Sequence, residues 1–158
     1  MAKVILDRNY EDILYQYSDM ITRICILNLR NSDDAKDCFQ NTFIQLLKTS
    51  TVFQDENHLK AWLIRVCINE CKYFRFKFYR KTIDIDDVLV VDKDHHLILL
   101  PEVLKLPKKY RNVLYLYYYE EYQINEISII LNINENTIKT QLKRGRDLLK
   151  KKVGDFNE

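Results

Sequence analysis

Basic and hydroxyl-bearing side chains share one side of a helical pattern near the C-terminal end of the sequence. They are Lys139, Thr140, Lys143, Arg144 and Arg146. Ile138 and Leu142, four residues apart, fall on the opposite side of the same pattern. Lys and Arg neutralise phosphates and hydrogen-bond to bases, and Thr hydroxyls hydrogen-bond to base edges. This face therefore has the chemistry of a helix that reads the major groove of DNA.

The residues before this helix predict how it is held. Residues 123–131 carry an apolar helical face, and Ser128 within them is small enough for a second helix to cross closely. Asn132 is expected in the left-handed conformation of a three-residue turn, and Asn134 as the N-cap of the next helix. A basic amphipathic helix is often only a solvated face, but here the cap, turn and apolar positions agree in register. The pattern predicts a helix-turn-helix, and three neighbours join its candidate DNA contacts: Asn136, Thr137 and Gln141.

Basic and aromatic residues are interleaved in a second stretch, residues 58–81. Between residues 60 and 81 there are seven basic residues and one acid, Glu70. Rings that stack on bases, next to cations that meet phosphates, are the combination that binds single-stranded nucleic acid. The candidate contacts are Trp62, Arg65, Asn69, Lys72, Arg75 and Arg80. The stretch by itself also fits a core helix with inward rings and solvated lysines; the helix-turn-helix elsewhere in the chain favours the nucleic-acid interpretation.

Composition and charge predict the elements that position these residues. The chain has 158 residues with only two Gly and two Pro, which favours an all-α protein over a β-sandwich. Residues 1–81 carry 13 basic and 10 acidic groups, residues 82–100 carry 1 and 5, and residues 101–158 carry 11 and 8. We therefore expect two small helical domains, residues 1–81 and 101–158, joined by a flexible acidic linker, residues 82–100.

Apolar periodicity places helices over residues 10–29, 32–47 and 58–81 of the first domain, with Ser32 as a candidate N-cap. In the second domain, Pro101 suits the first turn of a short helix, and Pro107 begins the next. No apolar run reaches membrane-spanning length and the N-terminus has no signal-like core, so we expect a cytoplasmic protein without membrane insertion. Without a Gly-rich phosphate loop or nucleophile elbow, we expect neither an enzyme, a small-molecule substrate nor a cofactor.

The four cysteines all fall inside apolar helical patterns: Cys25, Cys38, Cys67 and Cys71. Cys67 and Cys71 are four residues apart and could share a metal ion. The three histidines stand at no recognisable ligand spacing from them. The sequence therefore favours buried thiols in a reducing compartment and predicts no metal site.

Four segments together resemble the extracytoplasmic-function (ECF) sigma factors of bacterial RNA polymerase. They are the acidic helix of residues 33–43, the Ala-Trp-Leu segment of residues 61–69, the Leu-Pro segment of residues 106–114 and the helix-turn-helix of residues 123–146. Their order and spacing are those of the family, and they cover nearly the whole chain outside the linker. The ordered set is much more specific than any single motif.

The resemblance implies a factor that binds core RNA polymerase and directs initiation at promoter DNA. The first domain would bind the clamp helices of polymerase through Asp37, Gln40 and Asn41. Its basic-aromatic helix would open and hold the −10 element, while the helix-turn-helix would read the −35 element. Since members of the family are often held by an anti-sigma factor, such a protein is a candidate partner.

Several residues depart from the family pattern. Asn41 replaces an acid, which removes one expected salt bridge to polymerase, and Asn132 replaces the turn glycine. Gln141 replaces an arginine and could instead pair with adenine. Gly145 replaces an alanine, at a local cost of about 1 kcal/mol in helix propensity. The main alternative is a stand-alone helix-turn-helix regulator. It explains residues 107–153, but it assigns no function to the Asp37, Gln40 and Asn41 face or to the basic-aromatic stretch of the first domain.

Overall fold

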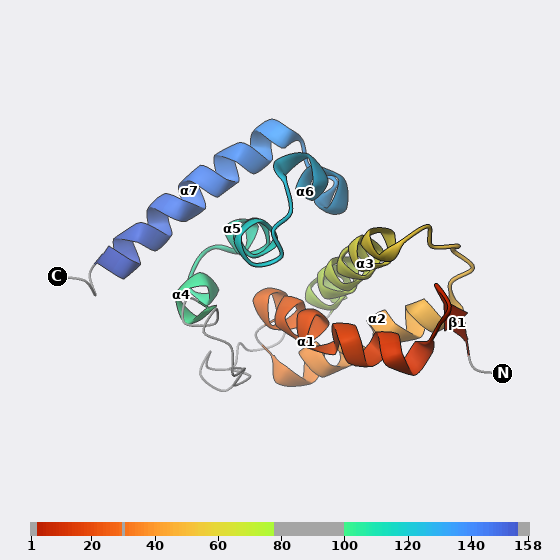
Figure 1. The fold of residues 1–158 in the computed structure, drawn as a ribbon. Helices are drawn as coiled ribbons and strands as arrows, with labels where there is room; N and C mark the ends of the chain where they lie inside the picture. Colours follow the sequence, from red (N-terminus) through yellow and green to blue (C-terminus); the bar gives the residue numbers. More distant parts are fainter. Residues whose placement is uncertain (1–2, 30, 78–99, 155–158) are drawn as a thin grey trace. The chain divides into compact units, whose positions relative to one another are not determined.

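The computed structural model describes residues 3–29, 31–77 and 100–154. They belong to two compact units, one within residues 1–84 and the other within residues 85–158 (Figure 1). The helical fold class is confirmed, although the first unit also contains a short β-hairpin that was not predicted. The predicted linker lies outside the described residues, apart from Leu100. Among the described residues, no helix is both long and apolar enough to cross a membrane.

The first unit is built on three helices, α1 (Tyr10–Asn28), α2 (Ser32–Lys48) and α3 (Glu56–Lys77). Each packs against the other two (Figure 1). Their apolar stripes meet in a core whose largest fully buried side chains are Ile13, Ile21, Ile24, Leu27, Leu46, Leu59, Leu63 and Ile64. Over the described residues the predicted helices are confirmed to within a few residues, because stripes of this length and period are the strongest signal a sequence offers. Residues 78–81 of the third predicted helix lie outside the described residues.

The β-hairpin pairs β1 (Val4–Ile5) with β2 (Arg8–Asn9) and fastens the start of the chain to α2. Just before β1, Lys3 Nζ donates to the carbonyl oxygens of Leu46, Leu47 and Thr49, at 2.8, 3.1 and 2.7 Å. The last carbonyls of a helix have no intrahelical partner and carry partial negative charge, so an ammonium group stabilises this end of α2.

The N-cap of α2 is Asn31, and the prediction of Ser32 was wrong by one residue. The Asn31 side-chain oxygen accepts from the backbone N–H groups of Asp33 and Asp34, at 2.9 and 3.1 Å. Asn and Ser are both good N-caps, so composition could not decide between neighbours. Ser32 is instead the first helical residue.

The second unit consists of α4 (Leu100–Leu104), α5 (Lys108–Leu114), a π-helical turn η3 (Tyr115–Tyr119), α6 (Ile124–Leu131) and α7 (Glu135–Gly154). The long helix α7 packs against α4, α5 and α6.

The π turn changes which face of this segment is buried. The Glu120 N–H donates to the Tyr115 carbonyl, five residues back, at 3.1 Å. Tyr115 is buried and Tyr117 only half-buried, whereas regular α-helical spacing from Tyr110, Val113 and Leu114 predicts an inward Tyr117. A single π turn contains more residues than an α-helical turn, so it shifts which of the following residues face the core. A prediction based on 3.6 residues per turn does not include this shift.

Candidate nucleic-acid and polymerase interface

The turn between α6 and α7 has the geometry predicted from its asparagines. Asn132 adopts the left-handed conformation, with φ 55° and ψ 50°. The Asn134 side-chain oxygen accepts from the Asn136 N–H at 2.7 Å and caps α7. Ser128 contributes more than small size, because its hydroxyl donates to the Ile133 carbonyl and its own carbonyl accepts from the Ile133 N–H at 3.1 Å. Hydrogen bonds on both sides thus fix the conformation of the turn, and the turn fixes the angle between α6 and α7.

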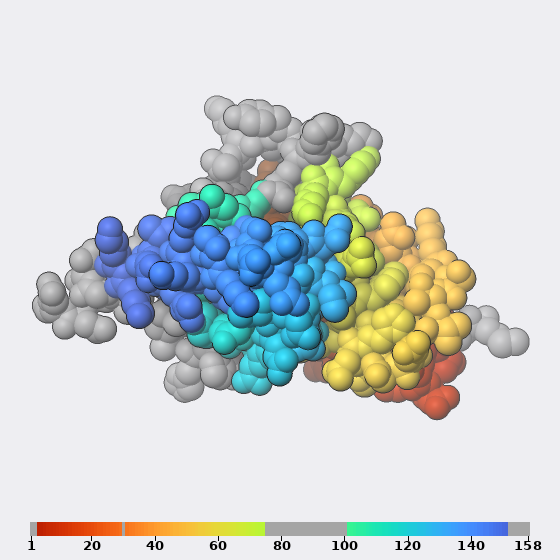
Figure 2. Space-filling model, turned by 90° about the horizontal axis from the view of Figure 1, so that it is seen from above, coloured from red at the N-terminus to blue at the C-terminus, as the bar shows by residue number. Residues whose placement is uncertain are grey.

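The two faces of α7 are divided as expected. Ile138 and Leu142 are buried against the rest of the unit, with 0% and 2% of their surface exposed. The exposed candidates are Asn136, Thr137, Lys139, Thr140, Lys143 and Arg144. Figure 2 shows α7 presenting a continuous surface (blue) to the viewer. Cationic and hydroxyl groups are therefore displayed on a rigid helix whose opposite side is anchored.

Gln141 stands apart from this exposed set. It is half-buried, and its side-chain oxygen is covered without a hydrogen-bond partner in the described part of the chain. Pairing with adenine would require the amide group to turn outward. In helical phase Gln141 lies about 60° from the inward Ile138 and about 100° from Leu142, at the edge of the buried side, which explains its partial burial.

One feature of this surface was not predicted from the sequence: an exposed tyrosine beside α7. Tyr118 of the π turn is 52% exposed, and its hydroxyl accepts from Arg146 Nη1 at 3.2 Å. This hydrogen bond, which Arg146 donates to the Tyr118 hydroxyl, stabilises the charged guanidinium and raises the pKa of Arg146 above its ordinary value. The π turn decides which tyrosines face outward, so no periodicity in the sequence could have identified this pair.

A polar stripe runs along α3. Trp62, Arg65, Asn69 and Lys72 recur every three or four residues, which places them on one side of a helix. Arg65, Asn69 and Lys72 are exposed, and Trp62 is half-buried. Arg75 continues the spacing within α3, but its side chain is not among those the structure describes, and Arg80 lies outside the described residues.

The aromatic residues of α3 divide between core and surface. Phe74 is buried, whereas Tyr73 is 50% exposed. Trp62 packs edge-on against Phe53, with ring centroids 5.4 Å apart, and Phe53 is itself buried. The inward ring expected of a core helix is thus found for Phe74, whereas Tyr73 and part of Trp62 remain at the surface. The Trp62 ring is held by a buried neighbour while part of it remains open to a ligand.

The candidate polymerase contacts lie on the outer side of α2. Asp37 and Gln40 are exposed and Asn41 is half-buried. The same side continues one turn further with Ile44 and Leu47, which are 41% and 47% exposed. Helical periodicity in the sequence allows either Leu46 or Leu47 to face the core, and the structure buries Leu46 completely. We call Asp37, Gln40, Asn41, Ile44 and Leu47 the α2 face.

Comparisons with known proteins agree with this arrangement. The family model "Sigma-70 region 2" matches residues 14–88, and "Sigma-70, region 4" matches residues 97–149. The ECF RNA polymerase sigma factor SigW of Bacillus subtilis is 30% identical over 93% of this chain and 90% of its own length. The ECF RNA polymerase sigma factor SigM of the same organism is 30% identical over 89% of this chain and 92% of its own.

Solved structures share the fold. The sigma factor RpoE of Bartonella quintana, crystallised with the anti-sigma factor NepR, is similar with a TM-score of 0.69, covering 90% of this chain and 94% of its own at 17% identity. CnrH in complex with the cytosolic domain of CnrY is similar with a TM-score of 0.66, covering 92% of this chain and 88% of its own at 16% identity. With matches to both regions of the family in order, and 30% identity along most of a family member, this chain belongs to the ECF sigma factors, which direct RNA polymerase to promoters.

Proposed function

We propose that the two units hold promoter DNA at two separate points while the α2 face holds core RNA polymerase. The observation that carries the proposal is the pair of exposed polar helix surfaces, one in each unit. Each is backed by a well-packed core that keeps it rigid. In this division of labour, residues 1–81 bind polymerase and open the −10 element, and residues 101–158 read the −35 element.

The α3 stripe suits an opened strand. Arg65 and Lys72 can meet phosphates, Asn69 can hydrogen-bond to a base, and the partly open Trp62 ring offers a stacking surface. Arg75 and Arg80 extend the positive charge in the sequence. In single-stranded DNA the base faces and edges are accessible, whereas in a duplex they are stacked and paired. The α3 stripe can therefore contact bases as well as phosphates once the promoter is open.

The exposed face of α7 suits the major groove of a duplex. Lys143 and Arg144 are suited to guanine or phosphate, and Asn136 to adenine. Thr140 donates its hydroxyl to the Asn136 carbonyl at 3.0 Å, so toward DNA its oxygen serves as an acceptor. Lys139 and Thr137 complete the set close to the N-terminal end of the helix, the end that recognition helices direct at base edges.

The α2 face suits a protein partner. It combines a carboxylate and amides with two exposed aliphatic residues, and an apolar centre with a polar rim is the usual composition of a protein interface. Because Asn41 supplies no charge, Asp37 is the one acidic group of this face. We infer that Asp37 pairs with a basic residue of the polymerase clamp helices, while Ile44 and Leu47 add apolar contact.

The length of the predicted linker is compatible with a two-point grip. The 19 residues of 82–100 span at most roughly 60 Å. A promoter spacer of about 16 base pairs, at about 3.4 Å each, is roughly 55 Å long. A tether of this length can reach both elements.

An anti-sigma factor is a further candidate partner. Two structural neighbours were solved as complexes, RpoE with an anti-sigma factor and CnrH with CnrY. By analogy, a small protein that covers the α2 face or α7 would keep this chain from polymerase. We place all these interactions in the cytoplasm, where polymerase and promoter DNA are found.

The test is transcription from a promoter library by purified protein with and without core polymerase. We expect sequence-specific transcripts that require both, and weak binding to duplex DNA by the protein alone. Lys150→Ala, an exposed change on α7 outside the candidate contacts, serves as the matched control and should transcribe normally. Tight operator binding without core polymerase, together with no transcripts in its presence, would favour the stand-alone regulator and reject the proposal.

A further inference from the structure

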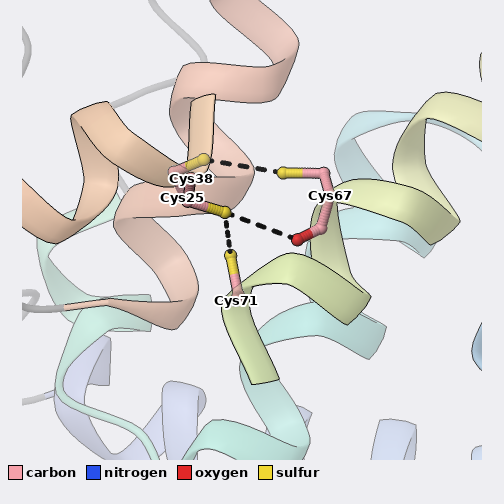
Figure 3. A group of neighbouring side chains, drawn as sticks. All are labelled: Cys25, Cys38, Cys67 and Cys71. Atoms are coloured by element: carbon pink, nitrogen blue, oxygen red, sulfur yellow. Dashed lines mark hydrogen bonds between the residues drawn. The ribbon is translucent and has the colours of Figure 1, made fainter. Parts of the chain in front are cut away.

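All four cysteines of the chain meet at one point in the first unit. Cys25 comes from α1, Cys38 from α2, and Cys67 and Cys71 from successive turns of α3 (Figure 3). The four sulfur atoms all lie within 4.8 Å of one another, and all four residues are buried. The sequence suggested only the pair on α3, because Cys25 and Cys38 approach it through the packing of three helices.

The spacing of the sulfurs fits one tetrahedral metal ion. A Zn–S bond is about 2.3 Å long, so the corners of a regular ZnS4 tetrahedron stand about 3.8 Å apart. In the structure Cys25 Sγ lies 3.5 Å from Cys67 Sγ, and Cys38 Sγ lies 3.2 Å from Cys71 Sγ. Both distances are far from the S–S bond length of about 2.05 Å in a disulfide. An iron–sulfur cluster would hold its ligands further apart, because inorganic sulfide and several iron atoms stand between them.

The thiols have little else to bind. Apart from one another, the sulfurs contact backbone carbonyls: Cys38 Sγ donates to the Cys67 carbonyl at 3.6 Å and Cys67 Sγ to the Ile21 carbonyl at 3.9 Å, both weak because the S–H group is a weak donor. Four thiolates that are buried and in contact would repel one another, and a dication at their centre would provide the opposite charge that offsets this repulsion.

We propose that Cys25, Cys38, Cys67 and Cys71 form a tetrathiolate site for a single zinc-type metal ion. Thiolate sulfur in tetrahedral geometry selects Zn²⁺ among the common divalent ions. Binding replaces up to four thiol protons with one Zn²⁺, so each metal bound releases protons and affinity rises with pH. No redox change is involved.

The site ties together the three helices that carry the functional surfaces. Cys67 and Cys71 lie on the buried side of α3, and Asn69 and Lys72 on its exposed side. Cys38 is next to Asp37, the acid of the α2 face. Metal binding would stabilise the packing of α3 and α2 against α1, and so hold the α3 stripe and the α2 face in place. The metal site itself does not depend on the function of either surface.

The experiment measures metal in the full-length protein purified under reducing conditions with zinc. Elemental analysis should find one zinc per chain, and replacement by Co²⁺ should give the visible bands of a tetrahedral thiolate complex. Each of Cys25→Ser, Cys38→Ser, Cys67→Ser and Cys71→Ser should weaken Co²⁺ binding more than about 100-fold, since even outer-shell changes cost 10–100-fold.

Two controls separate loss of a ligand from loss of the fold. Leu46→Ala creates a cavity in the same core without removing a thiol, and should retain the cobalt spectrum. A variant with all four cysteines changed to Ala should bind no metal, and its thermal midpoint should not respond to a chelator that lowers the midpoint of the wild type.

Three results would overturn the proposal. The first is a folded wild-type protein with four titratable thiols and no bound zinc or cobalt spectrum. The second is a disulfide-linked protein that takes up no metal after reduction. The third is zinc that stays bound in all four serine variants, which would place it elsewhere in the chain.

Discussion

Gly145 of α7 lies directly against Leu114 of α5. A Cβ atom added to Gly145 would stand 3.0 Å from Leu114 Cδ1 and 3.2 Å from Tyr110 Cβ, both closer than ordinary contact. The helix propensity given up at Gly145 therefore has a structural reason. The missing side chain lets α7 approach α5, and α7 is the helix that displays the candidate −35 contacts.

Gly145→Ala should destabilise the second unit despite its better helix propensity. Overpacking costs about 1–3 kcal/mol and the propensity gain is about 1 kcal/mol, so we expect a net loss of about 1 kcal/mol. Amide hydrogen exchange of α5 and α7 in the full chain would measure this loss of stability. In a Leu114→Ala background the two Leu114 contacts are gone and only Tyr110 Cβ remains close, so the same change should cost less. A loss of equal size in both backgrounds would reject close packing as the reason for glycine here.

The cap of α2 gives a prediction with an internal control. Asn31→Ala removes the acceptor of two backbone N–H groups and should cost about 1 kcal/mol in the free energy of unfolding. Ser32→Ala, one residue later, removes no cap and should change it by only a few tenths of that amount. Urea unfolding followed by the fluorescence of Trp62, the one tryptophan in the sequence, reports on this unit. The reverse ranking would show that Ser32 caps the helix in solution.

Tyr17 makes the first unit sensitive to alkaline pH. Its hydroxyl donates to Glu56 Oε2 at 2.6 Å, and burial together with this hydrogen bond raises its pKa above the ordinary value of 10.0. Because this pKa is raised in the folded state, the contribution of the Tyr17 hydroxyl to the free energy of unfolding is fully present below about pH 10. It is lost as the pH rises above that value, because the unfolded chain then releases a proton that the folded chain retains.

Tyr17→Phe should therefore lower stability by about 1 kcal/mol at neutral pH, the net value of one hydrogen bond. The difference from the wild type should shrink as unfolding is measured at increasing pH above 10. Tyr15→Phe, on the same helix but 84% exposed, is the control and should change neither quantity. A difference that stays constant with pH would contradict the assigned linkage.

The features predicted correctly are those with local causes. Asn132 and Asn134 occupy their turn and cap because each needs only its own conformation and a backbone group two residues away. The features that were missed depend on neighbours in space. The Tyr115–Glu120 turn departs from regular helical period, and Cys25 and Cys38 join Cys67 and Cys71 only through the packing of three helices. Gln141 shows a third limit, since its half-buried state depends on how closely α7 packs.

The division of labour between the units is the central claim, and one experiment addresses it directly. Two double variants are each assayed for transcription with core polymerase on a promoter library randomised at both elements. The first pair is Lys143→Ala with Arg144→Ala, and the second is Arg65→Ala with Lys72→Ala. The first pair should lose preference at the −35 element while keeping the −10 preference and polymerase binding. The second pair should lose the −10 preference and open-complex formation while keeping the −35 preference. Loss of the same element by both pairs, or loss of polymerase binding by the first, would contradict the account.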